Sequence, residues 1–242
     1  MSSATITTSA RLMNSTPQTE EQAMVRKVAV SSFLGNFIEW FDYASYSYFA
    51  TTIALVFFPT DNHTVAMLQT FGVFALSFIL RPIGALFWGS YGDKKGRKAA
   101  LAHSIMFMSV ASFLIGCLPS YSVIGVGAPI LLLLLRMVQG FSASGEYAGA
   151  ATFLGEYAPT SKRGIYCSLI PASTAIGLLA GSTLATLMTA NMNSSAMVGW
   201  GWRVPFLLAG PLGLIVLYIR AKLADSCLLY TSDAADEEDS VD

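Results

Sequence analysis

The sequence predicts an all-α membrane protein with six transmembrane helices. Only 12% of its 242 residues are charged, whereas soluble domains carry about a quarter. Six long apolar runs are separated by short polar connections, and a helix needs about 20 such residues to cross a bilayer. The lysines and arginines gather in alternate connections, which is typical of a chain that crosses a membrane several times.

The chain divides into a leading segment, a bundle and a tail. Residues 1–24 contain no apolar run and lack the apolar core of a signal peptide, so we expect a disordered cytoplasmic tail. Residues 25–224 form the predicted six-helix bundle. Its apolar runs are Val28–Phe57, Val65–Gly89, Ala99–Leu118, Val123–Phe153, Ile165–Ala190 and Val204–Tyr218.

The basic residues predict the orientation of the bundle. Eleven of the fourteen lysines and arginines, including Arg220 and Lys222 after the sixth run, fall on one side if the chain crosses the membrane six times. An excess of Lys and Arg marks the cytoplasmic side, so we expect a cytoplasmic N-terminus and C-terminus. The basic residues form no continuous stripe, and a nucleic-acid partner is therefore not expected.

Two carboxylates interrupt the first apolar run. Glu39 and Asp42 lie three residues apart, so they share a helix face. Charged groups in hydrocarbon are costly and are usually functional or paired. Carboxylates that lie close together at low dielectric hold a proton more readily than carboxylates in water. Either residue could carry a transported proton, or both could pair with arginine or tyrosine to hold the bundle together. The polar residues on the same face are Ser32, Gly35, Asn36, Tyr43 and Tyr46.

The fourth run carries a permanent cation, Arg136, on one face with Gln139, and Glu146 lies at the border of that face. An arginine cannot lose its proton inside a protein, so Arg136 needs a negative partner. The candidates are Glu39, Asp42, Glu146 and an acidic group of a substrate. A static pair that joins the first and fourth helices and a direct contact with substrate both fit the sequence.

Other positions are expected to shape the helices. Arg81 precedes Pro82 in the second run, where proline removes a backbone hydrogen bond and kinks the helix. Arg81 could bind the carbonyl groups freed by this kink or lie near the cavity, and of these we favour a structural role. Two pairs of glycines, Gly145 with Gly149 and Gly177 with Gly181, have the spacing that lets membrane helices approach closely.

The sequence offers no convincing catalytic or metal site. The stretch Gly140–Ser144 has serine where a Gly-x-Ser-x-Gly nucleophile turn needs its second glycine, and it lies within a predicted helix. The three cysteines have no metal-ligand spacing, and the chain contains two histidines. Neither an enzyme nor a metal centre is therefore expected.

The connection Gly89–Lys98 is the most distinctive stretch. It places five charges and three glycines between two apolar runs, with the spacing Gly-x-x-x-Asp-Lys-x-Gly-Arg-Lys. A second element on the same side has Glu156 followed by Arg163. Both resemble motifs of the major facilitator superfamily of transporters.

Four further strings resemble one family within that superfamily, the metabolite:proton symporters. They are the stretches 35–42 (GNFIEWFD), 81–84 (RPIG), 136–142 (RMVQGFS) and 201–206 (GWRVPF). The resemblance covers residues 28–224. One departure is Ser144, where many relatives have glycine.

The resemblance implies a fold and a location. This chain would supply the N-terminal half of a twelve-helix fold, built of two inverted three-helix repeats. The partner implied is a C-terminal six-helix half, and the site is a bacterial inner membrane. A cytoplasmic gate would use Asp93 to dock the facing half and Arg97 to pair with Glu156. The gate residues carried over are Gly89, Asp93, Gly96, Arg97, Glu156 and Arg163.

The resemblance also implies proton-coupled symport of a small organic acid by alternating access, driven by the proton gradient without a cofactor. Glu39 or Asp42 would carry the proton, and Arg136 with Gln139 would contact or position the substrate. A proline or betaine symporter is the alternative, since Trp40, Tyr43 and Tyr46 could form an aromatic cage for a quaternary ammonium. An alternative of another class is a membrane module that binds a partner and transports nothing.

The tail, residues 225–242, does not match a transporter. The stretch Cys227–Glu237 back-translates to DNA that resembles a transposon-end adapter used in sequencing libraries. We therefore expect that this tail is non-native sequence. The other interpretation is a genuine acidic tail.

Overall fold

A computed structural model describes residues 16–221, and every regular element in that range is a helix. Side chains are described from residue 23 onward. The elements are α2 (Thr16–Tyr48), α3 (Ala50–Phe57), α4 (His63–Ile79), α5 (Arg81–Lys95), α6 (Arg97–Cys117), α7 (Tyr121–Ile124), α8 (Gly127–Ala143), α9 (Glu146–Tyr157), η1 (Thr160–Lys162), α10 (Arg163–Cys167), α11 (Leu169–Asn191), α12 (Ser194–Gly199), η2 (Gly201–Arg203) and α13 (Val204–Ala221).

Each of the six predicted runs is helical. Five stretches of the described chain are long and apolar enough to cross a membrane, namely 63–95, 97–117, 127–157, 160–191 and 201–221. The remaining predicted run lies in α2 and α3, which together are longer than any of these five spans. Its sequence is less apolar because Asn36, Glu39 and Asp42 interrupt it.

Two helix boundaries differ from the sequence prediction. The helix α2 begins at Thr16, within the stretch expected to be a disordered tail, and Pro17 suits the first turn of a helix. The connection 89–98 is largely helical rather than a loop, because α5 continues to Lys95 and α6 begins at Arg97. Only Gly96 separates them, with a φ of 94° that L side chains rarely adopt.

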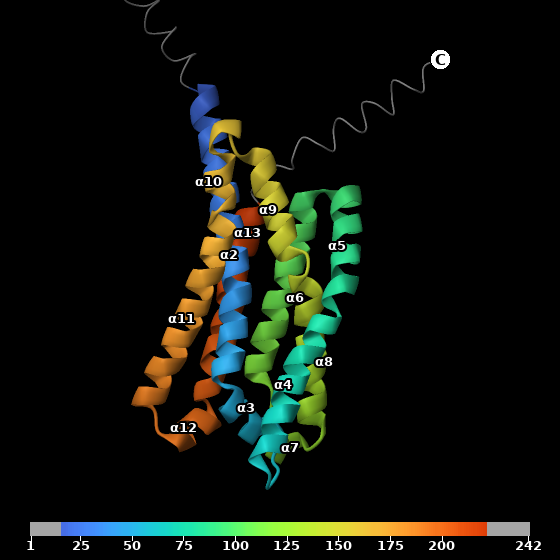
Figure 1. Ribbon diagram of the computed structural model, residues 1–242, viewed down its shortest axis with the longest axis vertical. Helices are drawn as coiled ribbons and strands as arrows, with labels where there is room; N and C mark the ends of the chain where they lie inside the picture. The colour runs from blue at the N-terminus through green and yellow to red at the C-terminus, as the bar shows by residue number, and fades with distance from the viewer. Residues whose placement is uncertain (1–15, 222–242) are drawn as a thin grey trace, which may run out of the picture.

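The helices form one bundle with all the long elements roughly aligned (Figure 1). The helix α2 packs against α11, α13 and α9, and α6 packs against α13 and α8. The helices α4 and α5 cover α8 on the other side. The start of α2, the α5–α6 turn, the α9–α10 turn and the end of α13 all lie at one end (Figure 1). This end is called the basic end below, because it carries Lys94, Lys95, Lys98 and Lys162.

Glycines set the closest helix contacts, as their spacing predicted. A Cβ atom at Gly177 would lie 2.8 Å from the carbonyl oxygen of Phe37, and one at Gly181 would lie 2.6 Å from the Cβ of Ala44. The helix α11 therefore approaches the backbone of α2 directly. Small residues at such positions let membrane helices gain van der Waals contact.

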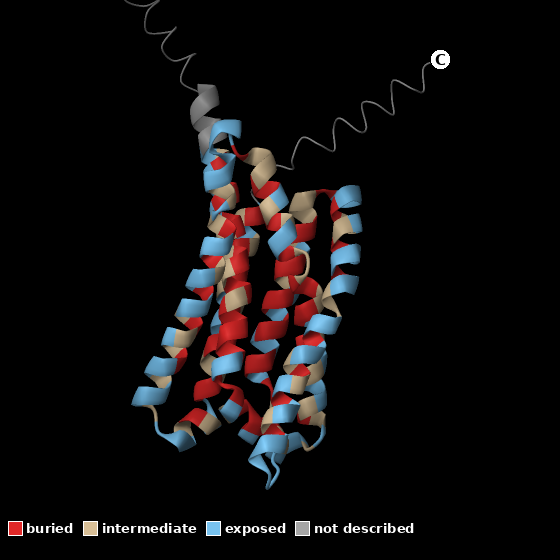
Figure 2. Cartoon of the chain, in the orientation of Figure 1, coloured by how far each residue is buried: buried red, intermediate tan, exposed pale blue. Residues whose placement is uncertain are grey.

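Burial divides the bundle into an inner and an outer surface (Figure 2). Buried residues line the facing sides of α2, α6 and α8, whereas the outer faces of α4, α5 and α11 are exposed (Figure 2). Many exposed side chains are large and apolar, such as Leu68, Leu86, Leu179 and Leu214. Apolar side chains on the outside and polar ones inside are expected of helices in lipid.

Candidate transport site

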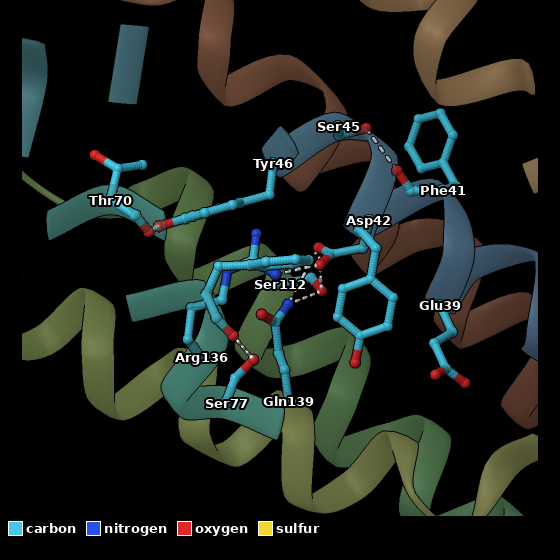
Figure 3. A network of polar contacts seen from close by, with 12 residues as sticks. Glu39, Phe41, Asp42, Ser45, Tyr46, Thr70, Ser77, Ser112, Arg136 and Gln139 are labelled. Carbon is cyan, nitrogen blue, oxygen red and sulfur yellow. Dashed lines mark hydrogen bonds and ion pairs between the residues drawn. The ribbon is translucent and has the colours of Figure 1, made fainter. Parts of the chain in front are cut away.

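The helix α2 positions both predicted carboxylates inside the bundle. Glu39 is 2% exposed and Asp42 is 4% exposed. Three residues turn an α-helix by about 300°, so the two side chains leave the helix about 60° apart. This offset gives them different partners: Figure 3 shows Asp42 within a polar network and Glu39 pointing away from it.

Asp42 is the centre of a network that joins three helices (Figure 3). Arg136 of α8 donates from Nη1 to Oδ2 of Asp42 at 2.7 Å. Ser112 of α6 donates to Oδ1 at 2.9 Å, and the amide of Gln139 donates to the same oxygen at 3.1 Å. Of the carboxylates considered from the sequence, the structure thus selects Asp42 as the partner of Arg136.

The Arg136 guanidinium is fully buried but only partly satisfied. Its central carbon lies 3.8 Å from the centroid of the Tyr46 ring, and the Tyr46 hydroxyl is fixed by a 2.9 Å hydrogen bond to the carbonyl oxygen of Thr70. Among the described residues, the Nε and Nη2 groups of Arg136 have no hydrogen-bond partner, nor has Oε1 of Gln139. Buried donors without a hydrogen-bond partner are rare in folded proteins. This centre therefore retains the capacity to bind a further acceptor.

Glu39 pairs with Arg81, which begins α5. Nη2 of Arg81 donates to Oε1 of Glu39 at 2.7 Å and to the Tyr43 hydroxyl at 2.6 Å. The helix is interrupted at Leu80, two residues before Pro82, and the Arg81 guanidinium binds Glu39 and Tyr43. The Arg81 side chain is 26% exposed, whereas the Arg136 side chain is 0% exposed.

A third buried pair joins Glu146 to Arg220, both 1% exposed. Ser104 also donates to Glu146 at 3.2 Å, and Arg220 donates to the carbonyl oxygens of Leu101 and Ser31. The helix break at residues 144–145 makes Glu146 the first residue of α9, where the helix dipole favours an anion. Four helices thus meet at one saturated ion pair.

Sequence reasoning missed the role of Arg220. It counted this residue among the basic residues outside the membrane, but α13 continues to Ala221 and buries it. The available signal was Glu146, a carboxylate inside the fourth run that also needed a cation. Gly35 lies directly against this pair, since a Cβ there would overlap Oε1 of Glu146 and Nη2 of Arg220.

The proposed gate pairing of Arg97 with Glu156 is not formed. Arg97 instead pairs with Asp93 at 3.0 Å, because the two residues lie four positions apart across the Gly96 turn. Oε2 of Glu156 is buried without a hydrogen-bond partner, and Arg163 makes no ion pair within the described residues. Gly89 lies on an open helix face, where an added Cβ would meet no atom within 4 Å.

The tyrosines expected in an aromatic cage are occupied by arginines of the chain itself. Arg136 covers the Tyr46 ring, and the central carbon of Arg81 lies 4.9 Å from the Tyr43 centroid. Trp40 keeps a partly exposed ring and contacts Tyr43 edge-on at 5.9 Å. A cage of all three rings is therefore not open in this structure.

Comparison with known proteins identifies the family. The sequence model described as "Sugar (and other) transporter" matches residues 27–240. The chain belongs to this family of the major facilitator superfamily. Members of this family are transporters and not enzymes.

Sequence relatives share more than two fifths of their aligned residues with the chain. The glycine betaine/proline/ectoine/pipecolic acid transporter OusA of Dickeya dadantii is 43% identical over 206 residues, which are 85% of this chain and 41% of OusA. The proline/betaine transporter of Salmonella typhimurium is 42% identical over the same shares. The chain thus spans about two fifths of the length of these relatives.

Solved structures agree on the fold. The proton:xylose symporter XylE bound to 6-bromo-6-deoxy-D-glucose superposes with a TM-score of 0.78 at 16% identity, over 90% of this chain and 48% of XylE. A partially occluded inward-open form of XylE from E. coli gives 0.76 at 19% identity. The described bundle therefore has the architecture of one half of a major facilitator transporter, as the sequence predicted.

Proposed function

We propose that the complete protein takes up a small zwitterionic osmolyte, such as proline or a betaine, together with protons. The relatives named proline/betaine transporters support this substrate class. The sequence favoured a small organic acid as the substrate and gave an osmolyte as the alternative. These relatives favour the osmolyte instead. Both substrate classes carry a carboxylate, so the arginines alone do not separate them.

The observation that carries the proposal is the buried pair of Asp42 and Arg136 with unused donors beside it. A buried cation without its partner is strongly unfavourable. When Asp42 takes up a proton, Arg136 loses its partner and its free Nε and Nη2 groups become ready to bind a substrate carboxylate. Proton binding and substrate binding then favour each other, which is the thermodynamic requirement for symport.

The same proposal includes the orientation of the bundle in the membrane and a second six-helix half of the transporter. The basic end of the bundle faces the cytoplasm under the positive-inside rule. Bacterial relatives of greater length support a bacterial inner membrane and a second six-helix half, which supplies the other wall of the cavity. Alternating access then consists of rocking one half against the other.

Uptake by cells that express the complete gene tests this function. Labelled proline, glycine betaine and a dicarboxylate are compared with and without a proton uncoupler, against cells with an empty vector. We expect uncoupler-sensitive accumulation of the zwitterions and no accumulation of the dicarboxylate. Accumulation that survives the uncoupler would contradict symport, and accumulation of the dicarboxylate alone would restore the organic-acid alternative.

A further inference from the structure

A second polar cluster consists of Glu39, Arg81 and Trp40. It is separate from the pair of Asp42 and Arg136, which is called the coupling centre below. Three polar atoms are buried and have no hydrogen-bond partner in the part of the chain that the structure describes, namely Oε2 of Glu39, Nε of Arg81 and Nε1 of Trp40. Glu39 itself is 2% exposed, so its free oxygen is withdrawn from water. Groups of this kind cost free energy when they stay unpaired, which calls for a ligand or a rearrangement.

Tyr43 links the three residues. Its hydroxyl accepts from Nη2 of Arg81, which also holds Glu39, and its ring contacts the Trp40 ring at 5.9 Å. Phe78 extends the aromatic surface, stacking on Tyr43 at 5.6 Å between centroids. One carboxylate, two N–H donors and three aromatic rings are therefore held on α2, α4 and the start of α5.

Exposure distinguishes this cluster from the coupling centre. Phe78 is 39% exposed and the Arg81 side chain is 26% exposed, whereas Arg136 is completely enclosed. In this six-helix half, a molecule at the surface of the bundle can contact Arg81 without any separation of the helices. It can reach Arg136 only after the helices around it move.

We propose that Glu39, Arg81 and Trp40 bind the two charged ends of the zwitterionic substrate; this inference rests on the proposed function. In this first-bound state the substrate carboxylate accepts from Arg81 and Trp40, as charge-assisted hydrogen bonds favour, before it reaches the free donors of Arg136. The substrate ammonium lies near Glu39 and the face of Trp40, where cation–π attraction acts. The Phe78 ring is covered by the Arg81 guanidinium, whose central carbon lies 4.5 Å from the ring centroid. The pair of Asp42 and Arg136, one turn along α2, responds to the proton.

The two named substrate types should depend on this cluster differently. Proline carries a secondary ammonium that donates N–H hydrogen bonds, so it can use the free oxygen of Glu39. Glycine betaine carries a quaternary ammonium without N–H groups, so it depends on the aromatic faces. A cluster that only holds helices together would affect both substrates equally.

The test is the Michaelis constant for each substrate in cells that express the complete gene. Glu39→Gln should raise the KM for proline about tenfold and the KM for glycine betaine by less than threefold. Trp40→Leu should do the reverse, and Arg81→Lys should raise both. Trp200→Leu and Arg203→Lys, an exposed tryptophan and a partly exposed arginine outside the cluster, should leave both constants unchanged.

The ratio of the two constants does not depend on how much folded protein reaches the membrane. A ratio that stays at the parent value in both Glu39→Gln and Trp40→Leu would overturn the inference. In that case the cluster only holds α2 and α5 together and does not bind substrate. Failure of the parent protein to transport either zwitterion would overturn the proposed function instead, so the two failures are distinguishable.

Discussion

Two buried ion pairs of this bundle each join a carboxylate to an arginine, but they differ in how many of their polar atoms have hydrogen-bond partners. The pair of Glu146 and Arg220 has partners on both carboxylate oxygens and both terminal nitrogens. In the pair of Asp42 and Arg136, two nitrogens of the guanidinium, Nε and Nη2, have no hydrogen-bond partner among the described residues. A saturated pair has nothing to gain from separating, whereas an unsaturated pair gains when a new acceptor arrives. We infer that the first pair holds the bundle and that the second one works in transport.

Breaking the saturated pair should have the largest effect on stability. Arg220→Met leaves the Glu146 carboxylate buried without its cation, and removing one partner of such a pair costs about 3–5 kcal/mol. We expect a large fall in the thermal unfolding temperature of the purified protein. The matched control is the double variant Glu146→Leu/Arg220→Met, because replacing both charges by apolar groups is often nearly neutral. A single variant as stable as the parent would show that the pair does not hold the bundle.

A smaller loss of stability is expected from Gly35→Ala, which disturbs the pair of Glu146 and Arg220 without removing a charge. The added methyl group overlaps Glu146 and Arg220, and overpacking of this kind costs about 1–3 kcal/mol. Gly72→Ala is the matched control, because no atom lies within 4 Å of its added Cβ and alanine favours helix by about 0.5–1 kcal/mol. Equal unfolding temperatures for the two variants would contradict the close contact at Gly35.

The smallest effect is expected at the exposed pair of Asp93 and Arg97. Asp93 is 65% exposed on its side chain, and ion pairs four residues apart on a surface contribute about 0.3–0.5 kcal/mol. Asp93→Asn should therefore change the unfolding temperature by less than Gly35→Ala does. A loss of stability comparable to that of Arg220→Met would mean that this pair carries part of the bundle.

The sequence was a good guide wherever local pattern decides the structure. Apolar runs mark the helices, Pro82 marks a break, and a permanent cation at Arg136 requires a carboxylate. The family motifs also identified the fold. Each of these features depends on residues that are near one another along the chain.

The sequence was a poor guide wherever packing between distant helices decides the structure. Glu39 and Asp42 share a helix face, but their partners come from α5 and α8, and a helical wheel does not specify which helix lies opposite each residue. Arg220 follows an apolar run and so resembled a residue outside the membrane. Arg97 was assigned to Glu156 by family pattern, whereas the short Gly96 turn leaves Asp93 within reach.

The most direct test of the difference between the two buried pairs is proton movement in proteoliposomes that contain the complete transporter. A substrate gradient is imposed without a proton gradient, and an entrapped pH dye reports protons that enter with substrate. The parent and the Glu146→Leu/Arg220→Met variant should both acidify the lumen as substrate enters. Asp42→Asn should move labelled substrate without acidification. Acidification per substrate equal to that of the parent in Asp42→Asn would contradict the assignment of Asp42 and Arg136 as the coupling centre.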